Sequence, residues 1–193
     1  MSNDSTVRID ADDLQRVTDL LSSITNGYET AMMRSINKAI KKARTVTSKG
    51  VRDKVALKVK IVNRSISTSL ASRNNLAGEI EITQKAVTLK EYGARPTKRR
   101  GVSVTTWKTE GRIRYRHAFA IDRRGGNIYA RNIQSSSYDG RYPLKALRGP
   151  SVKSVVDKFP LILSKAKQIG GSQMRDEMFR QVDVIINRAA GRG

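Results

Sequence analysis

The sequence predicts an α+β protein with a long N-terminal helical segment, a small, curled antiparallel sheet of about five strands, and C-terminal helices. Apolar residues recur every three or four positions over the first third of the chain. From about residue 70 they alternate with polar residues instead, and the helical period returns after a Gly-Pro-Ser sequence at residues 149–151. We therefore expect three segments, 1–66, 67–148 and 149–193, that together form one compact domain.

The first segment is predicted to be helical from its start. Asp10 and Asp13 offer an N-cap and an acidic first turn. An apolar stripe at helical spacing, which we interpret as core or subunit interface, comprises Leu14, Val17, Leu21, Ile24, Tyr28, Met32, Ile36, Ala39, Ala43 and Val46. Gly27 is expected to break or kink this helix and Gly50 to end it. Residues 51–66 read as a strand or a short helix, and we favour the helix.

The opposite face of this helical segment is basic. It carries Arg34, Lys38, Lys41, Lys42, Arg44 and Lys49. Such a face is either a solvated surface or a contact for a polyanion, and the sequence leaves both interpretations open.

Five stretches of the middle segment alternate as strands do and are separated by turn residues: 78–83, 86–92, 101–107, 112–121 and 127–131. The run 95–100, between the second and third stretches, contains Arg95, Lys98, Arg99 and Arg100 together with Pro96. We expect this run to be a basic loop, too polar to bury and too broken to pair. The Ser, Asp and Gly residues of the stretch 135–140 predict a second loop.

Pro150 and Ser151 suit the first positions of a new helix, which Pro160 is expected to end or kink. Residues 170–171, both glycine, predict a further break before a last helix at 172–190. The apolar sides of these two helices are Val152, Val155, Val156 and Phe159, then Met174, Met178, Val182, Ile185 and Ile186. The residues that we interpret as structural turn residues are Gly93, Gly101, Gly149, Pro150 and Ser151.

Charge is the strongest indication of function. The chain has 38 Lys and Arg against 17 Asp and Glu, a net charge of +21. Residues 1–30 carry a net charge of −4, whereas residues 31–60 carry +9 and residues 91–148 carry +10. A field of this sign attracts polyanions. The candidate partners are nucleic acid first, an anionic membrane second and an acidic protein surface third.

Residues suited to catalysis are few. The chain has no cysteine and a single histidine, His117, so thiolate metal sites and paired-imidazole sites are excluded. The usual motifs of phosphate-binding loops, serine hydrolases and zinc proteases are absent. We expect no enzyme, no cofactor and no metal site. The sequence shows no signal peptide and no membrane-spanning run, so we expect a soluble protein made in the cytoplasm.

Arginines alternate along residues 112–116, which places Arg112, Arg114 and Arg116 on one face of the predicted strand. With the basic loop they form the candidate contact for DNA or for a partner protein. Contacts of this kind would be made with phosphates and would carry no sequence information. No helix-turn-helix, RRM, KH or zinc-finger signature is present.

Several motifs occur in an order and spacing that resemble the minor tail protein Z family of tailed bacteriophages and prophages. They are the basic helix at 34–54, Leu-x-x-Tyr-Gly-Ala-Arg at 89–95, the basic loop with Gly-Val-Ser-Val at 101–104, the Ala-Phe pair at 118–119, and Arg-x-Pro-Leu at 141–144 leading to Gly-Pro-Ser. The resemblance covers residues 32–156. The lambda-type members of this family are tail completion proteins.

The resemblance implies a virion structural protein at the head-proximal end of a long non-contractile tail, assembled in the bacterial cytoplasm. It would be needed for head–tail joining and would help to hold the end of the genome. The partners implied are the tail terminator, the tail tube and the head–tail connector, with copies of the chain in a ring of about six. On this interpretation the 95–100 loop faces either DNA or the acidic surface of a neighbouring ring protein.

The alternative interpretation is a standalone, sequence-nonspecific nucleic-acid-binding protein. Such a protein would bind free nucleic acid tightly, with a steep salt dependence, as a small soluble species. A nuclease would require metal-dependent cleavage, which we do not expect.

Overall fold

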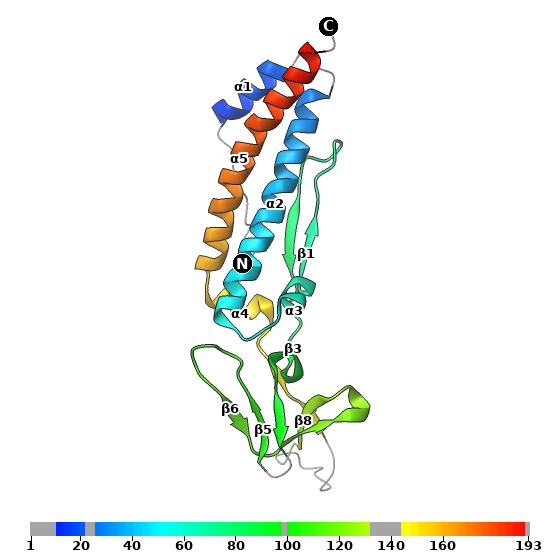
Figure 1. Cartoon of the computed structure of the whole chain (residues 1–193), viewed down its shortest axis with the longest axis vertical. Helices are drawn as coiled ribbons and strands as arrows, with labels where there is room; N and C mark the ends of the chain where they lie inside the picture. Colours follow the sequence, from blue (N-terminus) through cyan, green and yellow to red (C-terminus); the bar gives the residue numbers. More distant parts are fainter. Residues whose placement is uncertain (1–10, 22–25, 98–99, 132–143, 192–193) are drawn as a thin grey trace. The chain divides into compact units, whose positions relative to one another are not determined.

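The computed structural model describes residues 11–21, 26–97, 100–131 and 144–191 (Figure 1). Its α-helices are α1 (Ala11–Leu21), α2 (Gly27–Lys54), α3 (Val59–Arg64), α4 (Val152–Lys158) and α5 (Leu161–Ala190), with short 3-10 helices η1 (Leu89–Tyr92) and η2 (Asp122–Arg124). Small antiparallel sheets accompany them, so the predicted α+β class is confirmed.

Contacts divide the chain into two compact units, which we describe separately. The helical unit comprises Met1–Thr47, Ser67–Glu81 and Pro160–Gly193, and the β unit comprises Ser48–Ile66 and Ile82–Phe159. These units group segments that are distant in sequence. The three segments predicted from the sequence, with boundaries at residues 66 and 148, are continuous stretches of chain, and this division stays a prediction.

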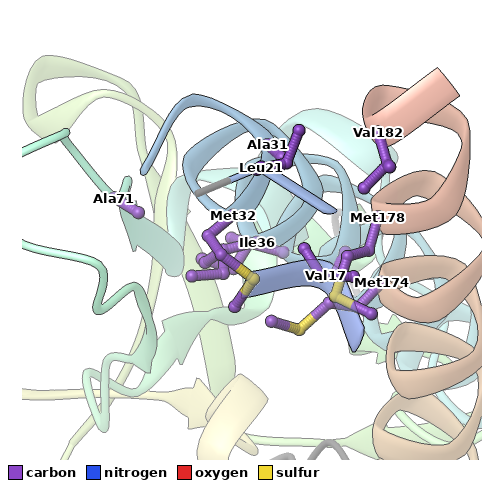
Figure 2. Close-up of a cluster of buried hydrophobic side chains, with 11 residues drawn as sticks. Val17, Leu21, Ala31, Met32, Ile36, Ala71, Met174, Met178 and Val182 are labelled. Carbon is purple, nitrogen blue, oxygen red and sulfur yellow. The ribbon is translucent and has the colours of Figure 1, made fainter. Parts of the chain in front are cut away.

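The core of the helical unit lies between α1, α2 and α5 (Figure 2). Its buried residues are Val17, Leu21, Ala31, Met32, Ile36, Ala39, Ile40, Ala71, Met174, Met178 and Val182. Most of the apolar stripes predicted for the first and last helices, interpreted as core or subunit interface, are therefore core, whereas Ala43 and Val46 are only partly buried and lie outside this cluster. Leu14, Tyr28, Ile185 and Ile186 pack against this cluster from its margin, whereas Ile24 lies outside the described residues.

A pair of short strands, β1 (Ile66–Ser69) and β2 (Glu79–Ile82), lies beside α2 (Figure 1). The side chain of Asn37 on α2 fixes the segment that follows β1. Its Nδ2 donates to the carbonyl of Ala71 at 3.0 Å, and its Oδ1 accepts from the amide of Ala71 at 2.8 Å. The amide side chain thus satisfies both backbone groups of a buried residue, which keeps Ala71 in the core.

The helix boundaries differ from the prediction at several glycines. Gly27 begins α2, so the expected break is confirmed, whereas α2 continues through Gly50 to Lys54. α5 is continuous through Gly170 and Gly171, where a break was expected. A glycine costs a helix only about 1 kcal/mol relative to alanine, and the apolar faces of these helices offset that cost by burial.

Gly170 has a packing role that explains its place in the helix. A Cβ atom at this position would lie 3.3 Å from the Cβ of Ala43 and 3.7 Å from the carbonyl oxygen of Ala39. The absence of a side chain therefore lets α5 approach α2 closely. Pro160 behaves as predicted, because α4 ends at Lys158 and α5 begins at Leu161.

The strands of the β unit form several small sheets, where about five strands of one sheet were expected. β3 (Val87–Thr88) pairs with β10 (Arg148–Gly149). A three-stranded sheet contains β4 (Arg95–Thr97), β5 (Gly101–Val104) and β6 (Ile113–Tyr115), and another contains β7 (Ala118–Ile121), β8 (Asn127–Arg131) and β9 (Leu144–Ala146). The predicted strand 112–121 is thus divided between two sheets.

The prediction that residues 95–100 are too broken to pair is wrong for the first half of the run. Residues 95–97 form β4, antiparallel to β5. Pro96 is compatible with this strand because β4 is an edge strand, where a missing N–H is tolerated. Thr97 closes the connection: its Oγ1 accepts from the amide of Arg100 at 3.1 Å and donates to the carbonyl of Gly101 at 2.9 Å.

The ambiguous stretch 51–66 contains the short helix α3, as favoured, but Val55 before it forms a single antiparallel bridge with Trp107. Several predictions fall outside the described residues: the N-cap Asp10, the loop residues Lys98 and Arg99, the loop 135–140, and Arg141 with Pro143.

Candidate functional site

The positive charge is concentrated in the β unit. The β unit contains 24 Lys and Arg against 6 Asp and Glu, a net charge of +18, whereas the helical unit contains 14 against 11, a net charge of +3. A surface that attracts polyanions therefore belongs to the β unit.

The two units also differ in how far they neutralise their own cations. In the helical unit Arg175 pairs with Asp13 at 3.1 Å, and Lys38 and Arg180 both pair with Glu177. Within the described part of the β unit the ion pair found is Lys153–Asp157, at 3.4 Å. Most cations of the β unit thus lack an acidic partner among the described residues.

Two members of the predicted basic face of α2 are used inside the helical unit. Lys38 donates to Glu177 at 2.7 Å, and Arg34 donates to Gln181 at 2.9 Å, which in turn donates to Glu177 at 2.7 Å. Glu177 is only 4% exposed. Its hydrogen bond from Arg180, helped by those from Lys38 and Gln181, lowers the pKa of Glu177 to about 2 although burial opposes this. The network therefore joins α2 to α5.

The sheet β4–β5–β6 has one apolar face and one cationic face. Val102 and Val104 of β5 are fully buried on the apolar face. Ser103 points to the other side, because successive residues of a strand alternate. It lies directly opposite Arg95 on β4 and opposite Arg114 on β6, so these three residues form a row across the sheet.

Arg112 joins this row from just before β6. Its Nη2 donates to both the carbonyl oxygen and the Oγ of Ser103, each at 3.1 Å. Arg95, Arg112 and Arg114 are exposed, and none of them forms an ion pair with another described residue. We call Arg95, Ser103, Arg112 and Arg114 the arginine face.

The structure brings some predicted site residues together and not others. Arg116 follows β6 and Arg100 precedes β5; both are exposed, and among the described residues the side-chain hydrogen bonds to Ser103 come from Arg112. Lys98 and Arg99 lie outside the described residues. Ser103 was missed, although the alternation of Gly-Val-Ser-Val places it on the side opposite the two valines.

The predicted turn residues Gly93 and Gly101 both adopt left-handed conformations that favour glycine. Gly93, with φ of 70°, ends η1, and its amide donates to the carbonyl of Lys90 at 3.0 Å. Gly101 has φ of 77°, and a Cβ atom there would lie 2.1 Å from the carbonyl oxygen of Tyr115. These glycines therefore set the entry to β4 and to β5.

The second turn, at residues 149–151, packs on Tyr92. A Cβ atom at Gly149 would lie 2.6 Å from Cε2 of the Tyr92 ring, and the Tyr92 hydroxyl donates to the carbonyl of Pro150 at 2.7 Å. Burial raises the pKa of Tyr92. Ser151 caps α4, since its Oγ accepts from the amide of Ser154 at 3.0 Å.

These contacts explain why two motifs far apart in the sequence occur together. The stretch 89–95 supplies Tyr92 and ends at Arg95, whereas the Gly-Pro-Ser turn supplies the surface on which the Tyr92 ring packs. Pairing of β3 with β10 holds the two stretches in register, with Val87 opposite Gly149. The two motifs thus fix the place at which β4 and the arginine face begin.

Chemically, the arginine face suits phosphate or carboxylate groups, because a guanidinium presents several donors in one plane. His117 is exposed. In the described ranges no three His, Cys, Asp or Glu side chains lie where they could share a metal ion. None of the helices in those ranges is long and apolar enough to span a membrane.

Neither the curated proteins nor the solved structures include a match to the chain. A family model described as prophage minor tail protein Z matches residues 13–188, from α1 to the end of α5. The match covers nearly all of both units, including the arginine face and the Tyr92 turn. The chain therefore belongs to the prophage minor tail protein Z family, whose role is that of a structural protein of the phage tail.

Proposed function

We propose that the protein is a tail completion protein that acts at the head-proximal end of a long non-contractile tail and is needed for head–tail joining. Its role is structural and not catalytic, and it needs no cofactor. Family membership supports the tail as the place of action. The observation that carries the proposal further is the net charge of +18 in the β unit, whose cations are largely left without acidic partners among the described residues.

The two units differ in composition in a way that suggests different roles. The helical unit has an apolar core and nearly as many acidic as basic side chains, as expected for an element that supports the fold. The β unit presents its charge outward. In a ring of copies, for which we propose about six, this charge would form a positive collar that holds DNA by counterion release, without sequence preference.

The partners we propose are the tail terminator, the tail tube and the head–tail connector, with genomic DNA at the junction. The basic run 95–100 faces either that DNA or an acidic surface of a neighbouring ring. Both partners are polyanionic surfaces, so charge alone favours neither.

The proposal can be tested by complementation of tails assembled without the protein. Purified protein is added to such tails together with filled heads, and infectious particles are counted. Alanine at Lys98, Arg99 and Arg100 together is expected to reduce joining by about tenfold or more. The matched control replaces Lys58, Lys60 and Arg64, three exposed cations at α3 in the same unit, and is expected to leave joining unchanged. Full joining by the first variant would contradict the role given to the basic run.

The alternative function is that of a standalone, sequence-nonspecific nucleic-acid-binding protein. The concentration of charge in one unit favours it as well. It predicts tight binding of free nucleic acid by the isolated chain at physiological salt and no association with tails. Sedimentation of the protein with purified tails distinguishes the two functions.

A further inference from the structure

We propose that the arginine face binds the phosphodiester backbone of duplex DNA and that Ser103 positions Arg112 for this contact. This inference rests on the proposed function, because it names the partner and the contact residues of the same basic surface. The sequence predicted Arg112 and Arg114 on one face of a strand, whereas the row across three strands and the role of Ser103 come from the structure.

The geometry of the sheet fixes the positions of two of the cations. Arg95 and Arg114 lie on the strands to either side of β5, each directly opposite Ser103. Neighbouring strands are about 4.8 Å apart, so the two backbones are separated by about 10 Å. The fully buried Val102 and Val104 hold the opposite face of β5 in the core. The row is therefore carried by a rigid support.

Arg112 is held before any ligand binds. One nitrogen, Nη2, makes both hydrogen bonds to Ser103. A guanidinium has five N–H donors on three nitrogens, so the donors on Nη1 and Nε remain for a phosphate oxygen. A side chain that is already ordered loses less conformational entropy on binding. Ser103 thus raises affinity without adding charge.

The composition of the face favours nucleic acid over an acidic protein. Protein interfaces centre on apolar and aromatic side chains, whereas DNA interfaces are more polar and much more positive. The row contains guanidinium and hydroxyl groups only. Ile113, the exposed apolar residue of β6, pairs with Val104 and so shares the other face. Phosphates, which repeat along DNA irrespective of sequence, fit such a row.

The first experiment measures binding of the full-length chain to a fluorescent duplex of arbitrary sequence, by anisotropy over a series of salt concentrations. A single copy is expected to bind with a dissociation constant on the order of micromolar, as for nonspecific contacts. Arg95→Gln, Arg112→Gln and Arg114→Gln should each weaken binding and reduce the slope of log K against log salt by about 1. Arg148→Gln, an exposed arginine on β10 in the same unit, is the charge-matched control and should change the slope least.

The second experiment separates positioning from charge. Ser103→Ala removes the hydroxyl that accepts from Arg112 and leaves every charge in place. Affinity should fall about three- to tenfold at fixed salt while the salt slope stays that of the natural chain. Ser103→Thr, which keeps a hydroxyl, should restore most of the affinity. Thermal unfolding of each variant provides the check on folding.

The inference would be overturned if the chain did not bind duplex DNA, or if Ser103→Ala kept full affinity. It would also be overturned if the slope of log K against log salt fell equally for Arg148→Gln and for the three arginine-face variants. Loss of tail binding by the face variants without any DNA binding would assign the face to an acidic protein instead. Failure of the tail-completion proposal is distinguishable, since DNA binding through the arginine face would then persist while the protein fails to join heads to tails.

Discussion

At the scale of single residues, Gly101 shows how backbone conformation and packing act together. Gly101 and Gly111 both have positive φ, 77° and 70°, but a Cβ at Gly101 would meet the backbone oxygen of Tyr115 at 2.1 Å, whereas a Cβ at Gly111 would meet nothing within 4 Å. Gly111→Ala should cost about 1 kcal/mol from backbone strain alone. Gly101→Ala adds a clash with backbone and should cost about 3 kcal/mol or more.

Urea unfolding of the two glycine variants tests this comparison. The urea concentration at the unfolding midpoint should be well below that of Gly111→Ala for the Gly101→Ala variant. The dependence of the free energy of unfolding on urea should be similar for the two variants. Equal destabilisation would show that strain alone decides the requirement for glycine at residue 101.

Glu177 makes the stability depend on pH in a defined direction. Its pKa is lowered from 4.5 to about 2 by hydrogen bonds in the folded chain. A carboxyl with a depressed pKa stabilises the fold above its unfolded pKa, and this stabilisation is lost as pH falls from about 4.5 to about 2. Because Lys38 and Arg180 are half-exposed and can be hydrated, Glu177→Gln should cost only about 1–2 kcal/mol at pH 7.

Chemical denaturation at pH 7, 4 and 2.5 measures this dependence. The difference in free energy of unfolding between the Glu177→Gln variant and the natural chain should decrease steadily as the pH falls below about 4.5. Asp157→Asn, which removes a partner from the exposed pair with Lys153, serves as control and should change stability by about 0.5 kcal/mol or less. A difference that stays constant with pH would contradict the role of the Glu177 network.

At the scale of elements, the long helices show what local sequence rules miss. The spacing of apolar residues predicted the buried faces of α2 and α5 correctly, but Gly50, Gly170 and Gly171 were read as helix ends. A glycine in a helix and a glycine at its end look alike in sequence. What distinguishes them is the partner helix, because a Cβ atom at Gly170 would contact Ala39 and Ala43 of α2.

Valine substitutions at the two adjacent glycines of α5 test this explanation. Both replacements introduce the same side chain into the same helix, so the change in helix propensity is the same for both and does not contribute to the difference in stability between them. The Gly170→Val variant should be less stable than the Gly171→Val variant by about 1–3 kcal/mol, because Gly170 is buried against Ala43 whereas Gly171 is only partly buried. Thermal unfolding monitored by circular dichroism measures the difference. A greater loss at Gly171 would contradict the close approach of α5 to α2 at Gly170.

The strand elements were predicted less well for a related reason. Short strands such as β3, β9 and β10 contain few residues, so alternation within them is weak and pairing with distant partners decides their existence. β4 contains a proline and an exposed arginine, which are poor strand residues locally. It forms because Thr97 closes the turn and β5 provides a paired neighbour.

At the scale of the whole molecule, the amount of charge and its distribution along the sequence were predictable, but the pairing of charges within the fold was not. The candidate arginines Arg95, Arg112 and Arg114 were identified from the sequence, and the structure gathers them around Ser103. The use of Lys38 within the fold could not be foreseen, because its partner Glu177 lies 139 residues away. The helical unit is nearly neutral because it contains 11 of the 17 acidic residues, so the β unit, at +18, is the anion-attracting part of the chain.

The most direct test of the account is electron microscopy of tails assembled without the protein, imaged before and after addition of the purified chain. The account predicts new density at the head-proximal end and recovery of head joining. An absence of tail binding, together with tight, salt-sensitive binding of the isolated chain to free DNA, would contradict the tail-completion role and support the standalone nucleic-acid-binding alternative.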